Sequence, residues 1–180
     1  MLTDIANKIF ALGTIASQLL LVLGLLYLVF FRKKQFAVVK FIEDNALMLG
    51  FLVALVSMLG SLFYSEIVGF PPCDLCWIQR IFMYPLVIVL AFAVIHKNKW
   101  LIRYAMASSI IGTLFAAYHN YMYYWNNGLD AFCQLGGMQV SCVKRYVFEF
   151  GYVTIPLMSL TAFALIIMLL MFYILKNKNQ

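Results

Sequence analysis

The hexapeptide PPCDLC, residues 71–76, separates two long apolar segments and decides how this chain folds. Two consecutive prolines prevent the preceding helix from continuing, and proline also suits the first turn of a new helix. We therefore predict that Cys73 and Cys76 occupy the first turn of a helix. The unpaired backbone N–H groups there make the helix end partly positive, which favours a thiolate, the reactive form of cysteine.

The apolar segments around this hexapeptide are long enough to cross a membrane. Of the 180 residues, 65% are hydrophobic and 11% are charged, whereas about 25% of the residues in a soluble domain are charged. Stretches of about 18 or more apolar residues indicate transmembrane helices. Five are predicted, over residues 9–31, 46–69, 77–95, 101–124 and 152–175. Because lipid offers the backbone no hydrogen-bond partners, we expect an all-α membrane bundle.

Basic residues gather where the predicted helices end on one side of the membrane. Nine of the thirteen lie there: Arg32, Lys33, Lys34, Lys40, Lys97, Lys99, Arg103, Lys176 and Lys178. Positive residues collect on the cytoplasmic side of a membrane. The C-terminus is therefore expected inside, and the N-terminus and both cysteine-bearing loops outside, where disulfides can form. This distribution accounts for the net charge of +6, so no nucleic-acid partner is expected.

The first apolar segment is expected to remain in the protein as a transmembrane helix. It is longer than the core of a usual signal peptide and lacks a convincing small-x-small cleavage site. The basic cluster at 32–34 follows it, as in a stop-transfer sequence.

The Cys-x-x-Cys spacing has three interpretations: a redox pair, a static disulfide or half of a zinc site. Zinc would need two more ligands, and the remaining cysteines, Cys133 and Cys142, are spaced widely and have no flanking histidine. No metal site is therefore expected. The second pair closes a small loop that contains two adjacent glycines. That loop could hold a structural disulfide worth ~2–3 kcal/mol or an exchangeable disulfide that a partner's thiolate attacks.

Two polar residues inside the apolar segments are candidates for a functional role. Arg80 is four residues after Cys76, on the same helical face, and a charge at that depth is costly and usually functional. His119 lies near the outer end of the fourth segment, at a similar depth. It could hydrogen-bond a carbonyl oxygen and help to move a proton, or a neighbouring helix could simply satisfy it.

The stretch PCDLCWIQRIFMYP, residues 72–85, resembles the DsbB family of membrane thiol oxidases, and particularly its BdbC-like branch from Gram-positive bacteria. Further points of resemblance are YSEI at 64–67, His119, the close pair Cys133 and Cys142, and residues 151–156. The resemblance extends from about residue 46 to 175.

Membership in this family implies a four-helix transmembrane bundle, here residues 46–180, that binds a quinone, menaquinone or ubiquinone, near its outer surface. Residues 1–45, a transmembrane helix and a basic cytoplasmic loop, are additional to that bundle. The resemblance says nothing about the role of this extra helix.

The resemblance also implies roles for individual residues. Cys76 would face the quinone and have Cys73 as its disulfide partner. Arg80 would hold the quinone, and His119 would lie close to it.

The same resemblance implies that the second pair meets a soluble protein. Cys133 would form a mixed disulfide with an extracytoplasmic thioredoxin-like thiol oxidase, and Cys142 would resolve it. The expected function is that of a thiol:quinone oxidoreductase in the bacterial cytoplasmic membrane, which passes electrons to the respiratory quinone pool and so supports disulfide bond formation. The alternatives are a cysteine-based metal-binding or metal-transport protein and a structural membrane protein with two inert disulfides.

Overall fold

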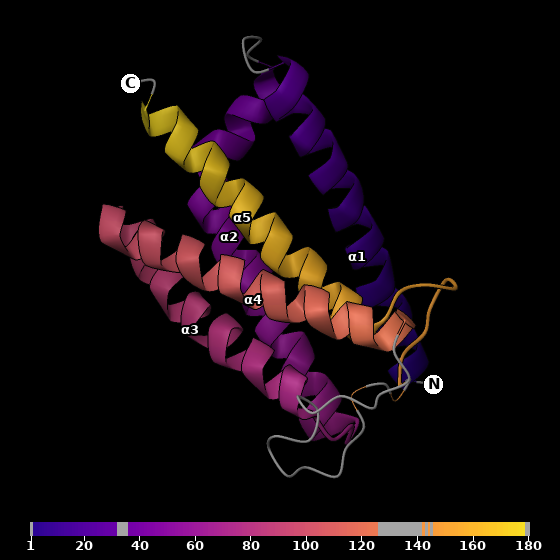
Figure 1. Ribbon diagram of the computed structural model, residues 1–180. Coiled ribbons are helices and arrows are strands. Elements are labelled where there is room, and N and C mark those ends of the chain that lie inside the picture. The colour runs from indigo at the N-terminus through magenta and orange to yellow at the C-terminus, as the bar shows by residue number, and fades with distance from the viewer. Residues whose placement is uncertain (1, 32–35, 126–141, 143, 145, 179–180) are drawn as a thin grey trace.

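The structure is a computed structural model that describes residues 2–31, 36–125, 142, 144 and 146–178. Five long helices and two π-helical turns make up most of this part of the chain (Figure 1). In chain order they are α1 (Leu2–Leu26), η1 (Tyr27–Phe31), α2 (Ala37–Leu62), η2 (Phe63–Ile67), α3 (Asp74–His96), α4 (Lys99–Trp125) and α5 (Ile155–Lys178).

All five long helices are long and apolar enough to cross a membrane. The prediction of an all-α membrane protein with five spans is therefore confirmed. Within the described residues, the β-structure is a single isolated bridge between Glu149 and Val153.

Several helices extend beyond the predicted apolar segments. α1 begins at Leu2 rather than at residue 9, and α2 begins at Ala37 rather than at residue 46. Residues 37–44, which were expected to form a basic loop, are therefore helical. The count of apolar residues identifies only the part of a helix that lies in lipid. Backbone hydrogen bonding continues beyond that part, so the helix itself is longer than its apolar segment.

Helices α2 to α5 form a ring in which each packs against the next, and α5 closes the ring on α2. α1 lies outside this ring and packs along α5 (Figure 1). The shared core contains Leu86 and Leu90 of α3 together with Phe163, Ile166 and Leu170 of α5, all fully buried. The architecture is thus a four-helix bundle with one additional helix docked on its α5 side.

Close approach of α4 and α5 depends on a glycine. A methyl group added at Gly112 would lie 2.4 Å from the ring of Phe163, which is fully buried. Small residues at helix interfaces allow such contacts in membrane proteins, where dispersion forces replace much of the hydrophobic effect. Phe163 therefore fills the space that Gly112 leaves.

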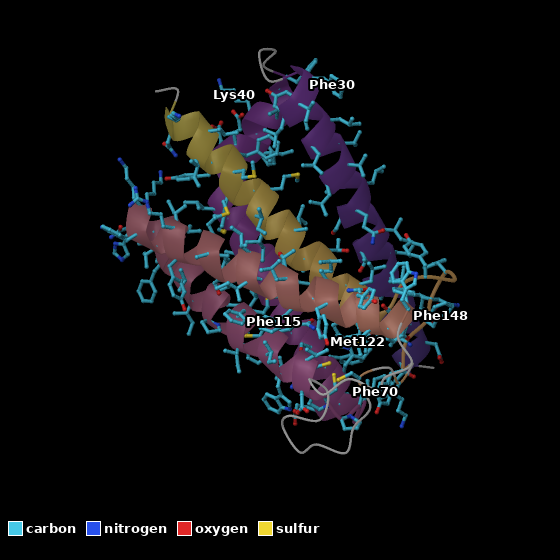
Figure 2. The ribbon with its side chains drawn as sticks, viewed as in Figure 1. Phe30, Lys40, Phe70, Phe115, Met122 and Phe148 are labelled. Atoms are coloured by element: carbon cyan, nitrogen blue, oxygen red, sulfur yellow. The ribbon has the colours of Figure 1, made fainter. Side chains whose placement is uncertain are left out.

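The two ends of the bundle differ in chemistry. We call the end that carries Cys73 and Cys142 the cysteine end; Phe70 and Phe148 lie toward it in Figure 2, and Phe30 and Lys40 lie at the other. At that opposite end Lys176 of α5 forms an ion pair with Asp44 of α2. The N- and C-termini therefore lie at opposite ends of the molecule (Figure 1).

Tryptophans mark both ends. Trp77 lies in the first turn of α3 and Trp125 is the last residue of α4, both at the cysteine end, whereas Trp100 is the second residue of α4, at the opposite end. All three side chains are exposed, from 44% to 76%. Exposed tryptophan at helix ends is typical of membrane interfaces.

Candidate active site

The cysteine motif lies at the beginning of α3. The chain leaves η2 through Gly69, whose φ of 78° is a conformation that glycine adopts without strain. It then passes the two prolines and enters the helix at Cys73, the N-cap residue, with extended backbone angles. The N–H of Trp77 donates to the carbonyl of Cys73 at 3.1 Å, which closes the first helical turn and places Cys76 within it.

Three cysteine sulfurs gather at this helix start. The Sγ atoms of Cys73 and Cys76 are 3.1 Å apart, in the dithiol form. Cys142 is buried and packs against Cys73 and Leu75. A hydrogen bond from the Cys142 thiol lowers the pKa of Cys73, but the hydrogen bond with Cys76 and burial outweigh it and raise that pKa to about 12. Cys73 is therefore a protonated thiol at neutral pH when the motif is reduced.

The structure brings one member of the predicted loop pair to the Cys-x-x-Cys motif. Cys142 touches Cys73, although 69 positions separate them in the sequence. Cys133 falls outside the described residues. The approach of the loop pair to the motif is thus established for Cys142.

His119 of α4 connects Cys142 to the interior of the bundle. The Gln79 amide nitrogen donates to Nδ1 of His119 at 2.9 Å, so the histidine's Nε2 carries the ring proton and donates to the Cys142 carbonyl at 3.1 Å. The hydroxyl of Ser159 in turn donates to the Gln79 side-chain oxygen at 2.5 Å. This chain of hydrogen bonds runs through three helices and fixes the backbone of Cys142 beside the motif. His119 is 1% exposed, and these two hydrogen bonds satisfy both of its ring nitrogens.

Sequence reasoning missed Gln79 and Ser159. Gln79 is 7% exposed in the middle of an apolar helix, and an uncharged polar residue in such a place was a signal that it needed a partner. Which partner it would find could not be read from one helix alone.

Arg80 lies at the inner side of the motif. Its Nη2 donates to the carbonyl of Ser61 on α2 at 3.1 Å. Its guanidinium also lies over the Trp77 ring, 5.2 Å from the centroid, within the range of a cation–π contact. Both contacts hold a permanent positive charge one helical turn away from Cys76.

A cavity of about 520 Å³ opens beside the motif. Its wall is mainly apolar, and its polar groups include Arg80, Gln79, His119 and Ser61. The sulfur-bearing residues Cys73, Cys76 and Cys142 also line it. At the cysteine end, Phe70 stacks on Tyr146, with ring centroids 4.6 Å apart, and on Tyr64, at 6.0 Å. The cavity thus joins the dithiol and the arginine beneath a layer of aromatic rings.

Three possible metal-ligand atoms also meet here. The sulfurs of Cys73 and Cys76 and a ring nitrogen of His119 lie within 4.8 Å of one another. A zinc site at the motif needs two ligands besides Cys73 and Cys76, and the fold supplies one candidate, His119, from another helix. Both ring nitrogens of His119 are already hydrogen-bonded, however, so a metal ion would have to displace the Cys142 carbonyl or Gln79.

Comparison with known proteins identifies the family. The family model described as "Disulfide bond formation protein DsbB" matches residues 43–174. Disulfide bond formation protein C of Bacillus subtilis is 42% identical over 120 residues, which cover 64% of this chain and 82% of that protein. Probable disulfide formation protein C 1 of Bacillus cereus is 38% identical over 138 residues, which cover 76% and 96% respectively.

A third relative is probable disulfide formation protein C of Halalkalibacterium halodurans. It is 40% identical over 123 residues, which cover 68% of this chain and 88% of that protein. No solved structure matches the chain. The resemblance noted in the sequence is confirmed, and the chain belongs to the DsbB family of disulfide bond formation proteins, in its Gram-positive branch.

Proposed function

We propose that this multi-pass membrane protein, a disulfide oxidoreductase of the disulfide bond formation family, is a thiol:quinone oxidoreductase. It reoxidises an extracytoplasmic thioredoxin-like thiol oxidase and delivers the electrons to a membrane quinone. The observation that carries the proposal is the position of the Cys73–Cys76 pair between Cys142 on one side and the cavity with Arg80 on the other. One pair of sulfurs can thus exchange with a loop cysteine and also face a lipid-soluble acceptor.

The residues of the cavity fit a quinone. A quinone is a flat apolar ring with two carbonyl oxygens, and binding sites of about 300–1,000 Å³ are usual for small ligands. Here a mainly apolar wall, one fixed guanidinium and a cysteine converge on the same space. When bound, menaquinone or ubiquinone supplies a two-electron acceptor that connects the protein to the respiratory quinone pool.

Electrons enter at the loop pair. A thiolate of the reduced partner attacks the Cys133–Cys142 disulfide at Cys133 and releases Cys142 as a thiolate. The partner's second thiol, rather than Cys142, then displaces Cys133, because attack by Cys142 would only re-form the loop disulfide and return the partner to its reduced form. The partner leaves as a disulfide, and Cys133 and Cys142 are left as two thiols, so two electrons have moved into the membrane protein.

The second exchange takes place within the protein. The Cys142 thiolate attacks Cys73 of the oxidised motif, which forms a Cys73–Cys142 bond and releases Cys76 as a thiolate. Cys133 then attacks Cys142, which restores the loop disulfide and leaves Cys73 and Cys76 reduced. The contact between Cys142 and Cys73 supports this order of attack.

Arg80 and the beginning of α3 stabilise the negative charge that this exchange places on Cys76. The helix N-terminus is partly positive, and a fixed cation in a dry site stabilises charge without having to reorient. His119 lines the same cavity and is placed to keep Cys142 in position.

The cysteine end is proposed to face the outside of the bacterial cytoplasmic membrane, and the C-terminus the cytoplasm. Lys97, Lys99 and Lys176 lie at the opposite end, together with Arg103. Positive residues favour the cytoplasmic side.

The direct test is to mix the purified protein with a reduced thioredoxin-like protein and a soluble quinone, and to follow the absorbance of the quinone. We expect catalytic reduction that requires both the protein and the dithiol partner. Loss of quinone absorbance at the same rate without the dithiol partner, or no loss at all, would refute the proposal.

A second function, a cysteine-based metal-binding or metal-transport protein, is favoured by one observation, the three ligand atoms of Cys73, Cys76 and His119. It predicts free thiols and stoichiometric zinc or copper in protein purified in air. Thiol counting together with metal analysis separates this function from the redox function.

A further inference from the structure

The additional helix α1 forms one wall of the cavity, although it lies before the part of the chain that the family model matches. Phe10, Gly13, Thr14 and Ser17 of α1 all line the space beside Arg80 and Cys76. The four-helix bundle alone would therefore leave this cavity without that wall.

Specific hydrogen bonds hold α1 in this position. At the cysteine end the Tyr64 hydroxyl donates to the Asn7 side-chain oxygen at 2.9 Å. Further along, the Gln18 side chain donates to Thr161 of α5 at 3.3 Å and accepts from the Tyr152 hydroxyl at 3.0 Å. Polar contacts to η2, to α5 and to the segment just before α5 thus fix the distance between α1 and the bundle.

The cavity is long and changes in character along its length. Cys76, Arg80 and His119 lie at its cysteine end, whereas Leu52 and Val53 of α2 line its far end. From Tyr64 to Leu52 is twelve residues, or about 18 Å along a helix. The cavity therefore continues from the polar groups near the motif into a channel between α1 and α2. Apolar side chains line this channel together with the hydroxyl groups of Thr14 and Ser57, each of which donates to a carbonyl of its own helix.

We propose that α1 forms the wall of a channel that holds the isoprenoid tail of the quinone, and that Gly13 keeps the channel open. The proposal rests on the proposed function and assigns a role to the helix that the family does not share. Gly13 lines the cavity, and an added Cβ there meets no heavy atom of the described residues within 4 Å, so a side chain at this position has room to extend along the cavity. The glycine is thus a place where bulk can be added without displacing a neighbour.

The test compares Gly13→Phe with Leu12→Phe. Leu12 is the next residue on the same helix, about 100° away around its axis, and its side chain is 57% exposed. Binding to each purified protein is measured by quenching of tryptophan fluorescence, with two probes: menaquinone with a tail of four isoprene units, and menadione, the same ring without the tail. Trp77 lies beside Arg80, so its fluorescence should report on binding of the quinone ring.

We expect Gly13→Phe to weaken binding of the tailed quinone by about tenfold or more, because several apolar contacts are lost. Binding of menadione to that variant, and of both probes to Leu12→Phe, should match the unmodified protein. Equal affinity of Gly13→Phe and the unmodified protein for the tailed quinone would overturn the proposal. Equal weakening of both probes would also overturn it, because the head site would then be disturbed.

Failure of the proposed function gives a different result, in which the unmodified protein binds neither probe. Gly13→Leu serves as the second variant if Gly13→Phe does not fold. Gly13→Leu should also weaken binding of the tailed quinone and not that of menadione, by a smaller factor. If Gly13→Leu affects the two probes equally, the channel is refuted.

Discussion

The proposed function gives Cys73 and Cys76 different tasks, although they lie only three positions apart in the sequence. Cys73 is the N-cap residue and packs against Cys142, whereas Cys76 lies in the first turn of α3, one helical turn before Arg80. Cys76→Ser should therefore abolish quinone reduction and still allow a mixed disulfide between the partner and Cys133. Quinone absorbance and non-reducing electrophoresis measure the two outcomes separately. Turnover at the unmodified rate would contradict the role of Cys76.

His119 is expected to act through Cys142. Replacing it with alanine removes the hydrogen bond to the Cys142 carbonyl and leaves the Gln79 amide without its partner. We expect the Cys73–Cys142 disulfide to form more slowly, as measured by rapid acid quenching. The apparent KM for quinone should stay close to that of the unmodified protein. The opposite result, a raised KM with unchanged disulfide exchange, would indicate that His119 contacts the quinone, as the family resemblance implies.

The sequence was informative about single residues where a local rule applies. Two prolines followed by cysteines predict a helix start, and α3 begins there. The connection from Ser159 through Gln79 to His119 could not be predicted, because it joins three helices whose relative rotation depends on packing along their full length. Spacing within one helix carries no information about that rotation.

Among the helices, α4 and α5 make the contact most sensitive to added volume. Gly112→Ala would push a methyl group against the buried Phe163 ring, and overpacking of this kind costs about 1–3 kcal/mol. Gly50→Ala is the matched control, since its added methyl would lie 3.9 Å from Leu90. Alanine is also a better helix former than glycine by about 1 kcal/mol. Thermal unfolding in detergent should show a lower Tm for Gly112→Ala and an equal or higher Tm for Gly50→Ala, and equal Tm values for both variants would refute this packing argument.

The helices themselves were predictable in number and order because each crosses a membrane and must be apolar over that length. Their ends were less predictable. The first part of α2 contains the charged residues Lys40, Glu43 and Asp44. A hydropathy window scores this stretch as polar and therefore does not predict that the helix begins there. Asp44 forms its ion pair with Lys176 from this helical extension. Such pairs between distant residues stabilise a helix end that no local pattern marks.

For the whole molecule, the testable quantity is its orientation in the membrane. In a variant whose four cysteines are replaced by serine, single cysteines can be placed at Phe148 or at Asn98. Both residues are exposed. Phe148 lies toward the cysteine end (Figure 2), and Asn98 lies in the turn between α3 and α4 at the opposite end. An impermeant maleimide should label the cysteine at position 148 in intact cells and the cysteine at position 98 only after permeabilisation, because the basic end is proposed to face the cytoplasm. The reverse pattern would invert the proposed topology.

The fluorescence of the exposed tryptophans can also report how deeply the protein sits in the bilayer. Helix α3, with Trp77 at its beginning, has 23 residues and is about 35 Å long, close to the hydrocarbon thickness of about 30 Å. Trp77 and Trp125 at one end and Trp100 at the other should therefore sit at the two glycerol layers. Phospholipids brominated near the ester groups would then dim the intrinsic emission strongly, while lipids brominated near the chain ends, at the bilayer centre, would leave most of it intact.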